Sequence, residues 1–437
     1  MFEDQVRDSL RRSVEGLQTG DPPIKSVVMR GRRRRLTKLT EATVALVLAL
    51  GTLGWVLVAL SGLSGRQSEG PVRKAAAGNA FPGGGRLLVS DTEGLKWMYP
   101  DGLTTMVARG FIGATPLQNG TQILAWKPTD VPGTAGATCA GCFYDVDYYV
   151  MGVDGSDPHL VLPAEAPEGN VYPHHLDVQI SPDGSKITYV RQEDLANGGV
   201  RGDELWLVDL ATGTKSDLGR VPPSDAAYVW KDDSTLLVQS PDERQLDWID
   251  SGTGTRQQYL SVTDPTITKL FQQLRPGVGA PTSLVPLGWS TDPSAPALAV
   301  LVVGADRASV VALVGNGTPV GLAPDARHDL SLQWGPAGLF ALTSFGGDRP
   351  ESGAGLYVGT AAAAAPQPSL PQVTGVEGVP EQVAFDPSGT VVVYQFSNGS
   401  LSFAPIPQAA CPQGSTCNSF APVTVNANVL HLLAWLP

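Results

Sequence analysis

Residues 177–219 read DVQISPDGSKITYVRQEDLANGGVRGDELWLVDLATGTKSDLG, and this stretch decides the fold. Short segments in which apolar and polar residues alternate predict half-buried β-strands. The strands we expect are 178–181, 186–191, 204–210 and 215–218. The PDG sequence at 182–184 predicts a tight turn, because Pro presets φ and Gly accepts the positive φ that follows. A second turn at 211–213 lets the last segment pair back as an edge strand, so four antiparallel strands follow one another.

Four antiparallel strands in a stretch of this length form one blade of a β-propeller, in which WD40-type repeats span ~40–45 residues. A single blade cannot bury both of its faces, so it needs neighbours. Short apolar segments that could each begin a blade recur along the chain, often with an aromatic residue at the end. They are 111–116, 175–181, 227–230, 284–289, 330–334, 382–385 and 430–435. The sequence therefore predicts an all-β, seven-bladed propeller over 86–437.

The segment 430–435 has no strand after it, whereas the strands expected over 86–109 have no first strand before them. Pairing the end of the chain with its beginning in one blade closes the ring and removes an open sheet edge. Six blades are the alternative, because the repeats around 261–283 and 350–372 are weak. We interpret those two stretches as insertions on the rim.

The stretch 177–219 resembles the PD40 repeat of the TolB-like propeller family, which is related to WD40 repeats. The matching residues are SPDG at 181–184, ELWLVD at 204–209 and Thr212-Gly213. A second copy of the turn is FDPSG at 385–389. The resemblance implies a propeller fold, and the best-known members of the family have six blades. It says little about the ligand.

The formal charge of −12 is unevenly distributed along the chain. Residues 1–40 hold ten Lys and Arg against five Asp and Glu, so this segment is +5 and the remainder is −17. An acidic main domain does not suit nucleic-acid binding, because the phosphate backbone is itself negative. We therefore expect no nucleic-acid partner.

The first 85 residues predict a membrane anchor. Residues 1–40 form a cytoplasmic arm with a short amphipathic helix and the basic run RGRRRR at 30–35. Residues 42–63 carry no charge and are long enough to span a bilayer as a helix, so 41–63 is the predicted transmembrane segment. Basic residues before this segment place the arm in the cytoplasm and the propeller outside. Residues 64–85, rich in Gly and Ala, predict a flexible stalk.

Four cysteines occur as two close pairs, Cys139 with Cys142 and Cys411 with Cys417. Outside the membrane, each pair favours a local structural disulfide. Cross-pairing between the two loops is an alternative that the sequence leaves open. A redox dithiol or half of a zinc site is the other interpretation of Cys139 and Cys142, although no βαβ unit surrounds them.

Histidines and charged residues lie on connections that enter new blades, which gather around one mouth of a propeller channel. They are His174, His175, Asp225, Arg327 and His328, and we predict that they bind ligand there. A metal site there would need a third ligand that converges with them in space, and the chain has only five His, so we expect neither a metal nor a cofactor. No G-x-S-x-G nucleophile motif occurs.

The sequence thus predicts a single-pass protein of the cytoplasmic membrane whose propeller is a non-catalytic binding or sensing module. The expected partners are an envelope protein, a peptide or a polysaccharide, together with the lipid bilayer through 42–63. The arrangement of arm, basic run and membrane helix also resembles actinobacterial envelope proteins suspected of partnering sigma factors. That resemblance implies an anti-sigma-like signal transducer. An envelope hydrolase or lyase with a site in the channel, and a purely structural scaffold, are the alternatives.

Overall fold

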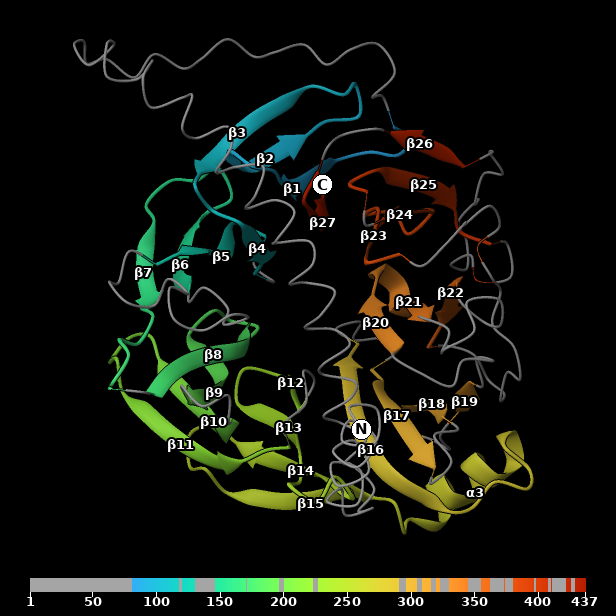
Figure 1. Ribbon diagram of the computed structural model, residues 1–437. Coiled ribbons are helices and arrows are strands. Elements are labelled where there is room, and N and C mark those ends of the chain that lie inside the picture. The colour runs from blue at the N-terminus through green and yellow to red at the C-terminus, as the bar shows by residue number, and fades with distance from the viewer. Residues whose placement is uncertain are drawn as a thin grey trace, which may run out of the picture. The chain divides into compact units, whose positions relative to one another are not determined.

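Seven antiparallel β-sheets are arranged in a ring (Figure 1). The structure is a computed structural model, and it describes residues 81–117, 120–129, 146–169, 171–195, 200–222, 227–290, 296–304, 309–315, 320–322, 330–344, 355–361, 373, 380–396, 398–407, 410, 422–425 and 429–437. The predicted arm, transmembrane segment and most of the stalk lie outside these residues. So do the four cysteines, Asp225, Arg327 and His328.

Each blade is built mainly from consecutive strands. Blade one contains β27 (His431–Leu436), β1 (Arg86–Ser90), β2 (Gly94–Met98) and β3 (Thr104–Arg109). Blade two contains β4 (Gly113–Pro116), β5 (Gln122–Pro128), β6 (Val146–Gly152) and β7 (His159–Leu162). Blade three contains β8 (Val171–Ile180), β9 (Lys186–Leu195), β10 (Val200–Asp209) and β11 (Lys215–Arg220). Blade four contains β12 (Tyr228–Trp230), β13 (Thr235–Gln239), β14 (Gln245–Asp250) and β15 (Arg256–Ser261).

The remaining three blades follow the same order. Blade five contains β16 (Pro281–Trp289), β17 (Leu298–Gly304), β18 (Ser309–Val314) and β19 (Val320–Leu322). In blade six the described strands are β20 (Leu330–Trp334), β21 (Leu339–Ser344) and β22 (Gly355–Thr360). Blade seven contains β23 (Gln382–Phe385), β24 (Val391–Gln395), β25 (Leu401–Pro405) and β26 (Val423–Val425). The seven-bladed prediction is confirmed, and the six-bladed alternative is wrong.

The ring closes where the end of the chain meets its beginning. Strand β27 pairs antiparallel with β1, from Arg86 opposite Leu436 to Ser90 opposite His431. The segment that leads into β1 strengthens this joint, because the ring of Phe81 stacks on Phe403 of blade seven with centroids 4.8 Å apart. The indole N–H of Trp435 also donates to the carbonyl of Gly84 at 2.7 Å. Both contacts tie the first and last parts of the described chain together.

Aromatic residues at the ends of the inner strands hold neighbouring blades together. Trp230 donates from Nε1 to Thr188 Oγ1 of blade three at 3.0 Å, and Trp289 packs edge-on against Trp248 of blade four at 5.8 Å. The ring of Phe385 lies so close to Gly335 of blade six that a Cβ there would come within 2.5 Å of it. Each of these residues therefore packs against the blade before its own.

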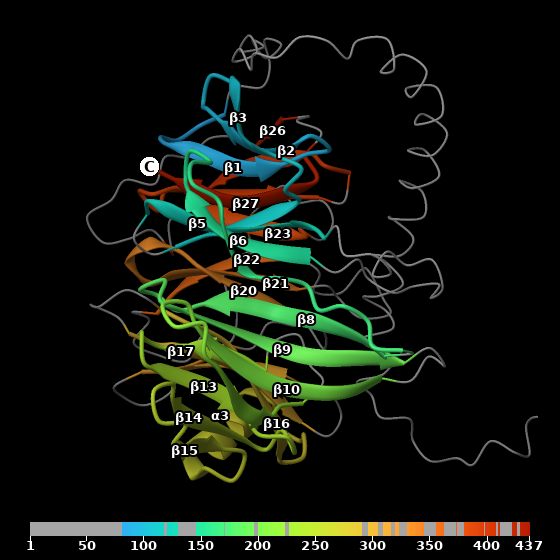
Figure 2. The same cartoon turned by 90° about the vertical axis from the view of Figure 1, so that its left-hand side faces the viewer.

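Blade three differs from the prediction in the length of its strands. The sequence predicts a polar loop between residues 191 and 204, but β9 continues to Leu195 and β10 begins at Val200. Polar side chains bridge the two strands there, with Gln192 Nε2 donating to Asp203 Oδ1 at 2.8 Å. Figure 2 shows β8, β9 and β10 reaching beyond the other strands on one side of the ring.

Helix α3 (Pro265–Leu274) forms part of the stretch expected to be an insertion on the rim. Its N-cap Asp264 accepts a hydrogen bond from the Thr266 N–H at 2.8 Å, and a proline follows at the first position. Ile267, Leu270 and Phe271 are buried, and the helix packs against β18 and β19, towards the outside of blade five (Figure 1). The insertion is thus an amphipathic helix that extends the core.

Within the described part of the chain, the structure holds no helix with the length and hydropathy needed to cross a bilayer. The predicted span 42–63 lies outside that part.

A candidate ligand site in the central channel

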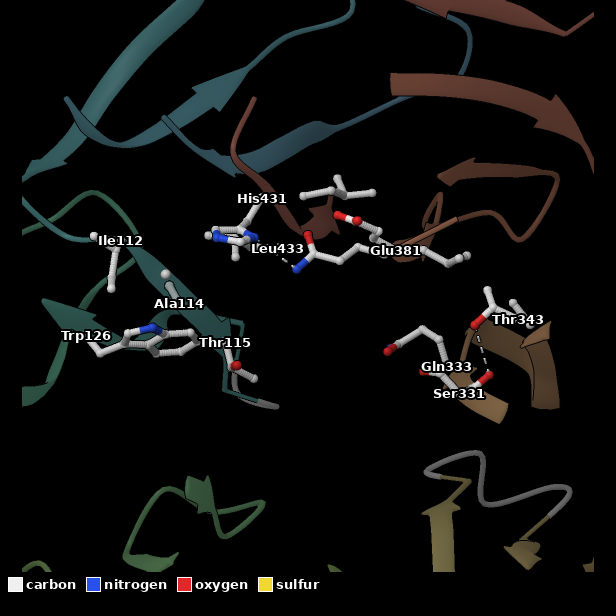
Figure 3. Close-up of a pocket in the computed structure, with 15 residues that line it drawn as sticks. Ile112, Ala114, Thr115, Trp126, Ser331, Gln333, Thr343, Glu381, His431 and Leu433 are labelled. Carbon is white, nitrogen blue, oxygen red and sulfur yellow. Dashed lines mark hydrogen bonds between the residues drawn. The ribbon is translucent and has the colours of Figure 1, made fainter. Parts of the chain in front are cut away.

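The first strand of each blade lies on the inner side of the ring (Figure 1). A cavity of about 430 Å³ opens there, in the central channel, between four of these strands and their neighbours. Its walls come from blades one, two, six and seven. Its polar lining includes Thr115, Ser331, Gln333, Thr343, Glu381 and His431 (Figure 3). A volume of this size lies within the ~300–1,000 Å³ usual for small-ligand sites.

Two walls face each other across the cavity (Figure 3). Blade two supplies Thr115 and the indole of Trp126, whereas blade six supplies Gln333 and Thr343. The indole lies directly against Gly113, where an added Cβ would come within 2.3 Å of the ring. Gly113 therefore fixes the position of this aromatic wall, because any side chain in its place would push the indole away.

The third side of the cavity carries the ionisable groups, Glu381 and His431. The Gln382 amide nitrogen lies 3.5 Å from His431 Nδ1. The imidazole is exposed to the channel, yet the surrounding walls desolvate it and lower its pKa. This shift favours the uncharged form of His431. No Lys or Arg occurs among the described lining residues.

The two predicted histidines that the structure describes lie elsewhere. His174 and His175 sit within β8 and not on a loop, and His174 is only 6% exposed. The turn after β8 begins at Ser181, and the equivalent turn after β23 begins at Asp386. Asp177 in β8 is therefore equivalent to Gln382 in β23, which lines the cavity. The histidines therefore lie beyond the level of the cavity, in the extended part of blade three, and they are absent from its described lining.

Sequence reasoning missed the residues that do line the cavity. Thr115, Ser331, Gln382 and His431 lie on the first strands that the sequence identified. Their position in these strands is the signal that could have found them. Their residue types, mostly hydroxyls and amides, carry no such signal.

His175 belongs instead to a cluster of charged residues in blade three. Glu165 Oε1 lies 3.3 Å from His175 Nε2, and Arg191 Nε lies 2.9 Å from Glu165 Oε2. The hydrogen bond from His175 and the charge of Arg191 together lower the pKa of Glu165 to about 2, although burial opposes this shift. The negative charge of Glu165 and, above all, burial raise the pKa of Tyr189 to about 12. This cluster joins the β7–β8 connection to β9.

Glu165→Gln should lower the free energy of unfolding by about 2 kcal/mol near pH 7, because the folded state favours the ionised carboxylate. The folded-state pKa is depressed, so this stabilisation is present above the ordinary pKa of 4.5 and is lost as the pH falls towards about 2. Urea unfolding at several pH values measures it. Glu168→Gln is the control, since Glu168 is exposed and outside the cluster. If the difference in unfolding free energy between Glu165→Gln and the wild type stayed constant as the pH falls towards about 2, the lowered pKa of Glu165 would be contradicted.

Comparison with known proteins finds distant structural likenesses to the chain. No protein-family model matches it, and no curated protein matches it. Solved structures that resemble it include TolB from Acinetobacter baumannii, with 17% identity, 67% of this chain and 62% of that chain covered, and a TM-score of 0.38.

Two other structures show the same kind of likeness. The dihydro-heme d1 dehydrogenase NirN in complex with DHE has 12% identity, coverage of 84% and 81%, and a TM-score of 0.44. The C-terminal WD40 domain of Sif2 has 12% identity, coverage of 74% and 78%, and a TM-score of 0.42. At these identities and TM-scores the likenesses carry no argument about function. The seven-bladed β-propeller fold of this chain rests on its own strand pairing.

Proposed function

We propose that this protein is a non-catalytic binding or sensing module whose propeller engages its ligand through the central channel. The cavity of about 430 Å³ between blades one, two, six and seven is the observation that supports it. Its described lining holds one carboxylate, Glu381, and one imidazole, His431. A hydrolase that uses paired carboxylates needs a second acid facing the first. Ligand binding needs no such pair of acids, so it is the simpler function for this cavity.

The proposal includes a location in the cytoplasmic membrane. An uncharged stretch at 42–63, preceded by the basic run at 30–35, supports a single-pass anchor with the arm inside and the propeller outside. The ligand would then be an envelope protein, peptide or polysaccharide. Signalling to a sigma factor is the further step of this proposal, and it would use the apolar face of the arm that contains Leu10, Val14 and Leu17.

A pull-down from solubilised membranes tests where partners bind. The full-length protein is compared with a version beginning at Gly70, the first residue of the compact unit that contains the propeller. A full-length Leu10→Asp/Val14→Asp variant is the matched control for the arm. We expect an envelope partner to be retained by all three proteins, and a sigma factor only by the unaltered full-length protein.

The outcomes separate the parts of the proposal. A sigma factor retained equally by the variant would contradict binding through this apolar face. Failure to retain any envelope component on the version from Gly70, with that version folded, would contradict a binding role for the propeller.

A further inference from the structure

The charge of the cavity limits what can bind there. No Lys or Arg contributes to the described lining, and burial lowers the pKa of His431, which favours its uncharged form. A phosphate, or the carboxylate end of a peptide, would be desolvated there with no Lys or Arg of the described lining to pair with it. The cavity therefore disfavours anionic ligands.

The hydrogen-bonding groups of the cavity are mostly neutral and lie on opposite walls. Thr115 on blade two faces Ser331, Gln333 and Thr343 on blade six (Figure 3). The bonds that these blade-six side chains make with the protein are long, since Thr343 Oγ1 is 3.5 Å from the Ser331 carbonyl and Gln333 Nε2 is 3.2 Å from the Trp334 carbonyl. A hydroxyl both donates and accepts, so these groups retain capacity for a ligand that also does both.

Trp126 adds a flat apolar surface to the same space. Its ring is held by Gly113 and by Tyr148, whose ring centroid lies 5.9 Å away. Among the described residues the structure shows no acceptor for its Nε1–H. An indole face attracts the weakly positive C–H groups of a saturated ring, because the π-system carries negative charge on its faces. An aromatic surface opposite neutral polar groups suits a ligand that is apolar on its ring faces and hydroxylated at its rim.

We infer that the channel cavity binds a neutral sugar of one or two rings, stacked on Trp126 and hydrogen-bonded to the hydroxyls and amides of blade six. This inference rests on the proposed binding function and names its ligand class. The sugar is either a free saccharide or part of a polysaccharide, since both present the same chemistry.

Titration calorimetry on the full-length protein in detergent tests the inference. The probes are maltose, cellobiose and N,N′-diacetylchitobiose, each up to ~20 mM because single-site sugar binding is weak. Inorganic phosphate, a neutral tripeptide and trilysine are the comparison probes. We expect a disaccharide to bind with an affinity that is unchanged between about 0.05 and 0.5 M NaCl, because a neutral ligand is insensitive to screening.

Variants show whether binding uses the cavity. Trp126→Ala should weaken disaccharide binding by about tenfold or more, and Thr343→Val by a few-fold. Trp248→Phe is the matched control, since Trp248 lies at the joint between blades four and five and is absent from the described lining; it should bind like the wild type. Co-sedimentation with purified cell-wall polysaccharide, repeated with Trp126→Ala, distinguishes a polymer from a free saccharide.

Each outcome decides the inference. Binding of a disaccharide or polysaccharide that Trp126→Ala weakens and Trp248→Phe retains supports it. Binding of trilysine, phosphate or the tripeptide alone overturns it, as does sugar binding that Trp126→Ala leaves intact. If the pull-down from membranes retains an envelope protein while no sugar binds, the sugar inference fails and the binding function stands. If neither experiment detects a ligand, both fail.

Discussion

Gln395→Leu should lower the free energy of unfolding by about 4 kcal/mol, because it leaves several buried polar groups without a partner. Gln395 ends β24 and is 2% exposed. Its amide nitrogen lies 3.1 Å from the Val429 carbonyl and 2.8 Å from the Leu430 carbonyl, and its oxygen accepts from the Leu432 N–H. One side chain therefore satisfies three backbone groups where the last strand enters the ring.

Gln239→Leu is the matched comparison. Gln239 occupies the corresponding end of β13 and is fully buried, and it donates to the Leu284 carbonyl at 2.6 Å, joining blades four and five. We expect it to cost about 2 kcal/mol. Denaturant unfolding measures both variants, and hydrogen exchange at β27 should accelerate in Gln395→Leu alone. Equal losses, with β27 equally protected, would show that Gln395 has no special part in closing the ring.

Gly94→Ala is expected to cost about 4 kcal/mol, because it combines backbone strain with a collision. Gly94 begins β2 with φ of +143°, a conformation that L-residues rarely adopt. A Cβ there would also come within 2.1 Å of the Ala108 carbonyl oxygen in β3. Since that oxygen belongs to the sheet backbone, the blade must open for the methyl group to fit.

Gly110→Ala separates the two effects. Gly110 also has a positive φ, +76°, but nothing lies within 4 Å of its Cβ position. We expect this variant to lose only about 1 kcal/mol, the usual cost of placing alanine in the left-handed region. Thermal or urea unfolding of the two variants measures the difference. Similar losses of unfolding free energy at both positions would mean that β3 moves aside at little cost, and that backbone strain alone acts at Gly94.

Much of the fold could be predicted because each blade repeats a local signal. Gly184 and Gly213 have the positive φ that the predicted turns require, at +76° and +69°. The long ribbon of blade three could not be predicted in the same way. Its residues between 192 and 203 show no apolar alternation, and the strands depend on polar pairs such as Gln192 with Asp203. Such pairs are visible only once the register of β9 and β10 is known.

The site was harder to predict than the fold, for a physical reason. The prediction chose histidines and charged residues, which are distinctive in a sequence. The cavity is made of residues such as Thr115 and Gln333, which are far apart in sequence and meet only because the ring brings blades two and six face to face. The repeated aromatic ends were identified as strand signals, but their packing against the preceding blade depends on contacts between blades.

The joint between Phe81, Phe403 and Trp435 has a mechanical consequence. A force pulling on the chain from the N-terminal side of Phe81 would act first on its stack with blade seven and on the bond from Trp435 to Gly84. From there the tension would pass into the β1–β27 pairing, whose hydrogen bonds are the seam of the ring. This pairing lies within blade one, so the load would reach the hydrogen bonds between β1 and β27 before it reaches the contacts between the other blades.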